Sequence, residues 1–379
     1  MIVQQFLHFM ETAPSDRRAL AVRSLARAYL YSDIDDTTRA EMEAAMTVVM
    51  DDSAAEVRRA LADTLSPALE APRHIMLAFI ADVTETAVLA LSRSPVFLDS
   101  ELVDIAAGAE DALQMAIASR PRLSNAVSAA IAEVGERDTC LRLLQNRGAA
   151  VARISQRRMA ERFGDDPEIR EALLQKPDLA SDVRQMLVLR LSDALGELVV
   201  HKSWVSEDRA RNLTREARER ATVAIAAETE TEELTALVEH LRVTGQLTTA
   251  LLLRAICAGN VAMFETALSV LAHVPEERVT SLIRSGRKQA FRAIYDKADL
   301  PAMAFDAFDV ALDTCREIAE RGGPRDRYRF TLHLVESVIA RYREITDGEV
   351  NELTGMLRRF AADQAREAAR DYARTAMVA

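Results

Sequence analysis

The side chains that most often carry covalent or metal chemistry are sparse and scattered in this sequence. Its six histidines never lie three or four residues apart, and its three cysteines, Cys140, Cys257 and Cys315, are isolated from one another. Zinc sites and catalytic clusters usually draw on such residues at short spacings. Cys140 and Cys257 occupy apolar helical positions, which favours a role as small buried hydrophobes. We therefore expect no metal, no cofactor and no catalytic nucleophile.

Phosphate and acid–base chemistry also lack their usual motifs. The sequence contains neither Gly-x-Gly-x-x-Gly nor Gly-x-x-x-x-Gly-Lys-Ser/Thr, the two glycine-rich patterns that cradle phosphates. The acidic pairs at 51–52 and 165–166 precede helical stretches, where carboxylates interact favourably with helix N-termini. We interpret them as caps, and the sequence indicates a binding protein that is not an enzyme.

Two clusters of basic side chains are the candidate binding sites for a partner or an anion. Cations aligned on one helix face can bind a phosphate, a carboxylate or an acidic protein surface, although a solvated face is the alternative. In the second half of the chain, residues 284, 288 and 292 would stack four residues apart on a single helix. The clusters comprise Arg284, Arg287, Lys288 and Arg292, and Arg153, Arg157 and Arg158.

The elements that position these residues are predicted to be helices. Hydrophobic residues make up 49% of the chain but aromatic residues only 5%, with 12 glycines and 10 prolines. The apolar mass is therefore mostly Ala, Leu and Val, a composition that favours helices over sheets.

Internal repetition is the clearest pattern in the chain. Turn residues recur at Pro95, Pro121, Gly148 and Pro177, at intervals of 26, 27 and 29 residues. Apolar residues follow each turn at about two, six and ten positions, which places them on one helical face. These predicted core residues are Ile105, Leu123, Val127, Ile131, Ile154, Leu179, Val183 and Leu187.

The pattern resumes after Gly245 and continues at Pro275 and Pro301. Short two-helix units cannot bury their apolar faces alone, so neighbouring units must stack. We predict an all-α protein, an α-solenoid of stacked HEAT-like helix-turn-helix repeats that ends in longer capping helices. The predicted core of this half comprises Leu251, Val279, Ile283, Met303, Phe305 and Phe308, and the capping stripes are Leu334, Val335, Val338, Ile339 and Tyr342, then Val350, Leu353, Leu357 and Phe360.

A charged segment interrupts the repeats near the middle of the chain. The segment runs from Trp204 to Ala227; from Val205 to Arg220 its charges alternate in sign and Leu213 is the only large apolar residue. We predict an N-terminal wing over 1–200, an exposed connecting helix over 201–230, and a C-terminal wing with capping helices over 231–379. Trp204, the only tryptophan, is expected to pack this junction, with an interface role as the alternative.

Net charge and hydropathy argue against nucleic acid and membrane as partners. A formal net charge of -11 argues against nucleic acid, because binding a phosphate backbone normally needs a basic surface. The longest apolar run, Ile75–Ala81, is much shorter than the roughly 20 residues that span a membrane. We also expect no signal peptide, a cytoplasmic location, and a protein partner, while homo-oligomers stay open.

Four stretches of the chain resemble a bacterial domain-of-unknown-function family, number 2336, with HEAT-like repeats. They are Asp52–Arg58, Ser94–Asp99, Ala116–Arg120 and Arg287–Pro301. The resemblance covers about residues 1 to 320 and implies a helical fold with a scaffold-like character. The family supplies no reaction, cofactor or catalytic residue to transfer to this chain.

The leading functional hypothesis is a protein-interaction scaffold or regulatory adaptor, because a helical repeat array offers an extended surface without any catalytic group. One alternative is a sensor of a small anionic ligand at residues 284–292. Another is a DNA-processing enzyme resembling HEAT-like alkylpurine glycosylases, against which the acidic balance and the scarcity of aromatics count.

Overall fold

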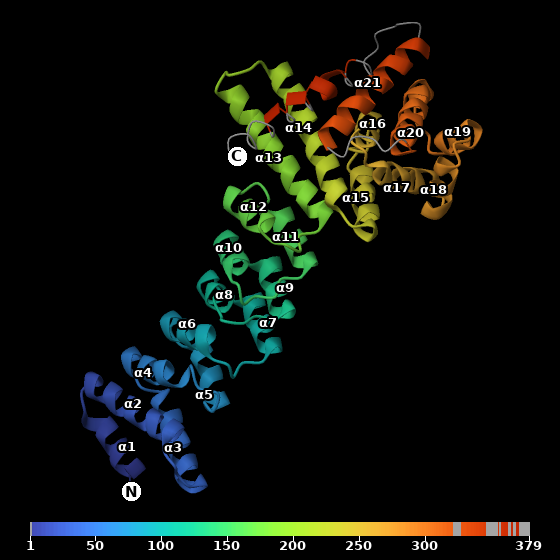
Figure 1. Ribbon diagram of the computed structural model, residues 1–379. Helices are drawn as coiled ribbons and strands as arrows, with labels where there is room; N and C mark the ends of the chain where they lie inside the picture. The colour runs from blue at the N-terminus through green and yellow to red at the C-terminus, as the bar shows by residue number, and fades with distance from the viewer. Residues whose placement is uncertain are drawn as a thin grey trace, which may run out of the picture. The chain divides into compact units, whose positions relative to one another are not determined.

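The computed structural model describes residues 2–320 and 327–345, together with 355, 358–362, 365–366 and 369–370. These residues are predominantly helical and form no strand, apart from a single β-bridge between Leu123 and Ala149 (Figure 1). The all-α prediction is therefore confirmed. The chain divides into two compact units, residues 1–179 (unit 1) and residues 180–379 (unit 2).

Unit 1 consists of short helices arranged so that every second helix packs on the next. One row runs from α2 through α4, α6, α8 and α10 to α12, and α7, α9 and α11 pack in the same manner in a second row. The helices are α1 (Ile2–Thr12), α2 (Ser15–Tyr31), α3 (Asp36–Val49), α4 (Ala55–Leu65), α5 (Arg73–Ala78), the 3-10 helix η1 (Phe79–Ala81), α6 (Thr84–Arg93), α7 (Asp99–Gly108), α8 (Asp111–Ala118), α9 (Asn125–Val134), α10 (Arg137–Gln145), α11 (Arg153–Phe163) and α12 (Pro167–Leu174).

Arginine–aspartate pairs join successive helices of the first row. Arg18 on α2 binds Asp52, which precedes α4, through Nε and a terminal nitrogen at 2.9 and 2.8 Å. Arg58 on α4 binds Asp82, which precedes α6, in the same bidentate manner at 2.8 and 2.6 Å. Bidentate pairs of this kind are stronger and more directional than single hydrogen bonds. They fix each helix against the start of the next.

The same contact recurs near the end of unit 1. Arg137 on α10 binds both carboxylate oxygens of Asp166 at 3.0 and 3.1 Å. Asp166 also caps α12, because its Oδ1 accepts hydrogen bonds from the backbone N–H groups of Glu168 and Ile169. The interpretation of Asp166 as a cap is confirmed, and the pairing with Arg137 adds a link between two helices.

The turns before α9 and α11 lie side by side. The N–H of Leu123 donates to the carbonyl of Gly148 at 3.1 Å, and the N–H of Ala150 donates to the carbonyl of Leu123 at 2.9 Å. A Cβ at Gly148 would stand 1.8 Å from the carbonyl oxygen of Pro121. Only glycine can therefore occupy this position without moving the neighbouring turn.

The core positions predicted after Pro121 and Pro177 are buried, those after Gly148 are shifted, and Ile105, predicted after Pro95, is only half-buried. Val127, Ile131, Val183 and Leu187 are all buried. Ile154, the corresponding residue after Gly148, is 74% exposed. Helices α9 and α13 begin four residues after their turn residue, whereas α11 begins five residues after Gly148. This one additional residue rotates Ile154 out of the core.

Unit 2 combines a long helical hairpin with a cluster of shorter helices. Its helices are α13 (Ser181–His201), α14 (Glu207–Glu228), α15 (Thr231–Val243), α16 (Thr249–Cys257), α17 (Val261–Ala272), α18 (Glu276–Arg284), α19 (Lys288–Lys297), the 3-10 helix η2 (Ala302–Ala304), α20 (Phe305–Glu320) and α21 (Arg327–Ile345). Helix α13 packs on α14 and α15, and α16 packs on α14, α17, α20 and α21.

A group of aromatic rings forms the centre of the shorter helices. Phe264 stacks on Phe308 with ring centroids 5.1 Å apart, and Phe291 stacks on Phe305 at 5.2 Å. Tyr295 contacts three of these rings, and its hydroxyl donates to the carbonyl of Pro301 at 2.9 Å. The burial predicted for Phe305 and Phe308 is confirmed, but Met303, which lies in η2, is 85% exposed.

The boundary between the units lies after Leu179, about twenty residues before the expected end of the first wing. The charged segment does form a helix, α14, but this helix belongs to unit 2 and packs along α13. Trp204 lies in the turn between α13 and α14 and is 70% exposed. The expectation that it packs a junction is wrong, because the turn lies at the free end of the hairpin.

The end of the chain is described in part. Leu334, Val335 and Val338 on α21 are buried, which confirms the first capping stripe. Phe360 is also buried. The remaining predicted residues of the second stripe, Val350, Leu353 and Leu357, and the side chain of Tyr342, lie outside the described residues.

Candidate interaction surfaces

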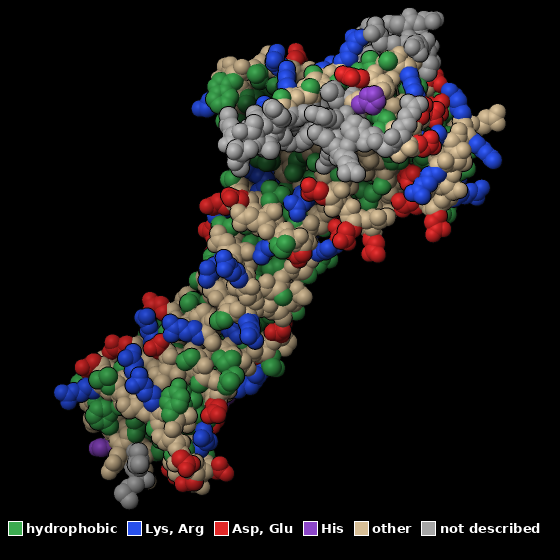
Figure 2. Space-filling model, viewed as in Figure 1, with side chains coloured by type: hydrophobic (Ala, Val, Ile, Leu, Met, Phe, Trp, Pro, Cys, Tyr) green, Lys and Arg blue, Asp and Glu red, His purple; other side chains and the backbone are tan. Residues whose placement is uncertain are grey.

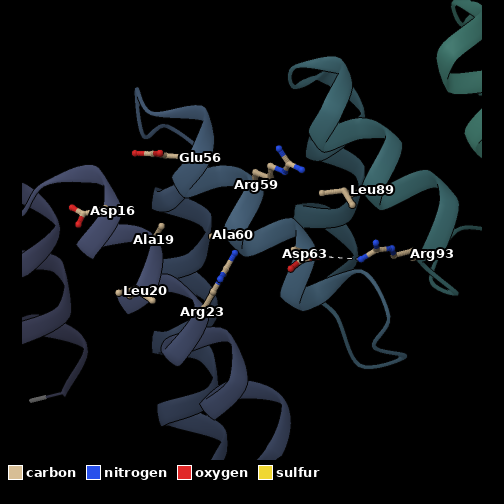
Figure 3. A pocket seen from close by; sticks show the side chains of 10 residues that line it. All are labelled: Asp16, Ala19, Leu20, Arg23, Glu56, Arg59, Ala60, Asp63, Leu89 and Arg93. Atoms are coloured by element: carbon tan, nitrogen blue, oxygen red, sulfur yellow. Dashed lines mark hydrogen bonds and ion pairs between the residues drawn. The ribbon is translucent and has the colours of Figure 1, made fainter.

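A groove crosses three consecutive helices of the first row in unit 1 (Figure 3). Helices α2 and α4 contribute residues at identical spacing, forty positions apart, and α6 contributes two more. The groove has a volume of about 440 Å³. Its lining is Asp16, Ala19, Leu20 and Arg23 from α2, Glu56, Arg59, Ala60 and Asp63 from α4, and Leu89 and Arg93 from α6. Helices α2 and α4 thus present the same four positions to the groove, and α6 presents two of them.

Apolar and basic side chains meet in this groove. Leu20 is 62% exposed. Arg23 is exposed and points from α2 toward Ala60 in Figure 3. No ion pair engages Arg23 within the described residues. Leu20 and Arg23 therefore offer an apolar contact and a free cation about one helical turn apart.

Charged side chains of α4 and α6 line the rest of the groove. Arg93 pairs with Asp63 at 2.9 Å, and Arg59 lies 3.6 Å from Glu85. All four side chains are more than 45% exposed, so these pairs are weak and can exchange for a partner's charges. In Figure 2, acidic and basic side chains mingle over the part of unit 1 that α2, α4 and α6 form.

The basic cluster at residues 284–292 does not form a single stripe. Helix α18 ends at Arg284 and α19 begins at Lys288. Gly286 lies between them with φ +65°, a left-handed conformation that ends the first helix. The prediction that 284, 288 and 292 stack on one helix is therefore wrong, and the reason is this glycine turn.

The structure divides the four residues of this cluster into two pairs. Lys288 binds Asp306 and Asp309 on α20 at 3.3 and 2.9 Å, and Arg292 binds Asp296. Both cations also lie over the ring of Phe305, at 5.5 and 4.5 Å from its centroid. Arg284 and Arg287, in contrast, are exposed and have no ion pair within the described residues.

The second cluster, Arg153, Arg157 and Arg158, lies on α11 as expected. Arg158 is bound by Glu133 on α9 through two hydrogen bonds of 2.7 and 2.8 Å. Arg153 is exposed and Arg157 is half-buried. At least one member of this cluster therefore links two helices of the second row.

The buried thiols are unsuited to nucleophilic chemistry. Cys140 and Cys257 are fully buried, as predicted. Burial raises the pKa of Cys140 to about 11 and also raises the pKa of Cys257, so both remain protonated at neutral pH. In the described part of the chain, no group of three or more His, Cys, Asp or Glu residues could hold a metal ion.

Sequence reasoning missed the groove. Its charged residues are few on each helix, and only the spacing between helices shows that they share a surface. The forty-residue interval between Arg23 on α2 and Asp63 on α4, with the thirty-residue interval from Asp63 to Arg93, would have been the usable signal. The turn residues that recur in the sequence begin at Pro95, after the three helices that form the groove.

Comparison with known proteins gives one match. A family model described as an uncharacterised protein conserved in bacteria (DUF2336) matches residues 86–346. The match starts later and ends later than the expected range of 1 to 320. No curated protein and no solved structure matches the chain. Among the described helices, none is long and apolar enough to cross a membrane.

Proposed function

The chain belongs to this bacterial family, and on that premise we propose that unit 1 is a HEAT-like repeat scaffold that binds a protein partner rather than catalysing a reaction. The groove across α2, α4 and α6 is the proposed binding surface. The observation that carries the proposal is the repetition of one residue spacing on consecutive helices, with an exposed leucine and a free arginine among the repeated positions.

The packing of unit 1 supports the repeat interpretation. In stacked repeats each unit contacts only its neighbours, and a surface that runs across several units can receive a long segment of a partner. The pairs Arg18–Asp52, Arg58–Asp82 and Arg137–Asp166 link neighbouring helices of one row. They hold the row in register, so that side chains on separate helices can serve one partner.

The side chains of the groove indicate the chemistry of the partner. An apolar side chain of the partner would rest on Leu20, and a carboxylate of the partner would pair with Arg23. Arg59 and Arg93 would exchange their present ion pairs for ion pairs with carboxylates of the partner. These pairs would orient the partner and speed its association, and they would add little affinity. An amphipathic protein segment with acidic residues meets these requirements.

The test is affinity capture from a bacterial lysate with three forms of the full chain. The groove variant carries Leu20→Asp and Arg23→Glu. The matched control carries Val48→Asp and Arg17→Glu, two exposed residues of α3 and α2 that do not line the groove. A protein retained by the wild type and the control, but lost by the groove variant, supports the proposal. Equal retention by all three forms would exclude the groove as the binding surface.

A second candidate function rests on the other basic residues. Arg284 and Arg287 stay exposed and unpaired within the described residues, while their neighbours Lys288 and Arg292 are engaged. Two free guanidinium groups flanking a glycine turn are suited to a small phosphate or carboxylate ligand. A thermal-shift series with inorganic phosphate and citrate, run on the wild type and on Arg284→Ala with Arg287→Ala, tests this. A shift common to both forms would exclude the site.

A further inference from the structure

The hairpin of α13 and α14 is poorly covered along much of its length. Each helix is roughly 30 Å long. Between Val188 and Ala221, Ala210 is the only buried residue. Helices in proteins gain most of their stability from packing of an apolar face. Over this length the hairpin has one buried residue and an ion pair of 3.0 Å between Glu216 of α14 and Arg359.

A groove with a volume of about 640 Å³ runs along one face of this hairpin. Its floor consists of small or apolar residues, Gly196 and Val200 of α13 with Ala210 and Thr214 of α14. The two helices come close here, because a Cβ at Gly196 would stand 2.9 Å from Oγ1 of Thr214.

The two walls of this groove carry opposite charges. The α13 wall presents Asp193 and Glu197, and the α14 wall presents Arg211, Arg215 and Arg218. Some of these charges are satisfied within the hairpin, since Asp193 pairs with Arg218 and Arg211 pairs with residues of its own helix. Glu197 and Arg215 form no ion pair within the described residues.

These observations lead us to infer that the hairpin binds the same hairpin of a second copy of this chain, groove against groove. A two-fold axis parallel to the helices would place the acidic wall of each copy over the basic wall of the other. Every helix would then have antiparallel neighbours, as in a four-helix bundle. The opposite arrangement, with an axis across the helices, would bring walls of like charge together.

The positions of Glu197 and Arg215, which form no ion pair within the described residues, fit this symmetry. Glu197 and Arg215 each follow directly after a residue of the Gly196–Thr214 contact, so they lie at nearly the same level along the hairpin. An axis parallel to the helices preserves this level. Glu197 of each copy therefore faces Arg215 of the other, and the interface contains this ion pair twice.

The symmetry gives a strict test by sedimentation of the full chain over a concentration series. We expect a dimer for the wild type. Glu197→Arg and Arg215→Glu each place like charges across the interface twice, so each should raise the dimer dissociation constant at least tenfold. Mixing the two variants should restore dimers of wild-type strength, because each mixed pair then has an arginine opposite a glutamate at both sites.

Arg209→Glu is the matched control, since Arg209 is exposed on α14 and does not line the groove. It should dimerise as the wild type does. Circular dichroism verifies that each variant keeps its helical content, and a wild-type dissociation constant that rises with salt gives a second reading that needs no variant. A monomeric wild type, or single variants that dimerise normally, or a mixture that stays monomeric, would each overturn the inference.

Discussion

Units 1 and 2 keep their helices together by different means. In unit 1, arginine–aspartate pairs join α2 to α4, α4 to α6 and α10 to α12, and backbone hydrogen bonds join the turns before α9 and α11. In unit 2, five aromatic rings from α17, α19 and α20 meet in one cluster. Contacts of the first kind act between neighbours, whereas a shared core couples several helices at once. The comparison predicts that a disruptive substitution acts locally in unit 1 and spreads over several helices in unit 2.

The largest expected effect is in the aromatic cluster. Phe308→Ala should lower the free energy of unfolding of unit 2 by about 3 to 5 kcal/mol, because it removes a fully buried ring that stacks on Phe264. Hydrogen exchange followed by mass spectrometry should show faster exchange across α17 to α20 together. The control is Met303→Ala, an exposed residue of the same region. Faster exchange limited to α20 would contradict a shared core.

A smaller and more local effect is expected at the paired turns of unit 1. Gly148→Ala should destabilise by about 3 kcal/mol, the upper end of the range for overpacking, because its Cβ would overlap the carbonyl oxygen of Pro121. Exchange should increase in α8 to α11 and remain unchanged near α2. Gly108→Ala is the control, since nothing lies within 4 Å of a Cβ there. An equal increase along all of unit 1 would show that its repeats are not independent.

The arginine–aspartate links should contribute less than either of these. Arg58→Ala leaves the nearly buried Asp82 carboxylate without its bidentate partner, at an expected loss of about 2 kcal/mol in unfolding free energy. Urea unfolding followed by circular dichroism measures this loss. Arg59→Ala, at an exposed neighbouring position with a long 3.6 Å ion pair, is the control and should change little. Equal losses in both variants would contradict a specific role for the link.

The same pair predicts a pH dependence. Its hydrogen bonds from Arg58 lower the pKa of Asp82 below its ordinary value. A carboxylate with a lowered folded-state pKa stabilises the fold above its unfolded pKa, about 3.9, and this stability is lost as pH falls through the folded-state pKa. As the pH is lowered from 6, the urea concentration at the unfolding midpoint should therefore decrease once the pH is below about 4. This decrease should be less steep in Asp82→Asn. An identical slope in the variant would refute the linkage.

The smallest effects are expected in the basic cluster of unit 2. Lys288→Glu should cost about 1 kcal/mol, because it faces Asp306 and Asp309. Arg284→Glu should stay within about 0.5 kcal/mol, as for other exposed surface changes. Thermal melts of the two variants compare them directly. Equal losses would mean that Arg284 has a structural partner, and would remove the basis for an anion site beside Gly286.

Sequence patterns could predict the helices and most of the core, because apolar periodicity repeats every turn of a helix. They failed where a single residue changed the local geometry. The extra residue before α11 exposes Ile154 and places Ser155 in the core, and Gly286 separates Arg284 from Lys288. The extra residue before α11 leaves no mark in the composition of its segment, whereas Ser285-Gly286 is a turn signal that the sequence does carry.

The candidate groove was missed for a different reason. Leu20, Arg23 and Arg93 come from helices that are distant in the chain, and only the packing of α2, α4 and α6 brings them to one surface. Sequence separation explains why the arginine–aspartate links escaped notice as well. An arginine that binds an aspartate 24 to 34 residues later resembles any other surface arginine until the two helices are placed together.

Photo-crosslinking in living bacteria tests the central claim, a protein-binding groove in unit 1, most directly. A benzophenone amino acid is placed at Leu20, inside the groove, and in a separate form at Val48, an equally exposed position on α3 outside it. The account predicts a discrete covalent adduct with another protein from position 20, lost when Arg23→Glu is added, and none from position 48. Absence of an adduct at position 20, or the same adduct from both positions, would contradict it.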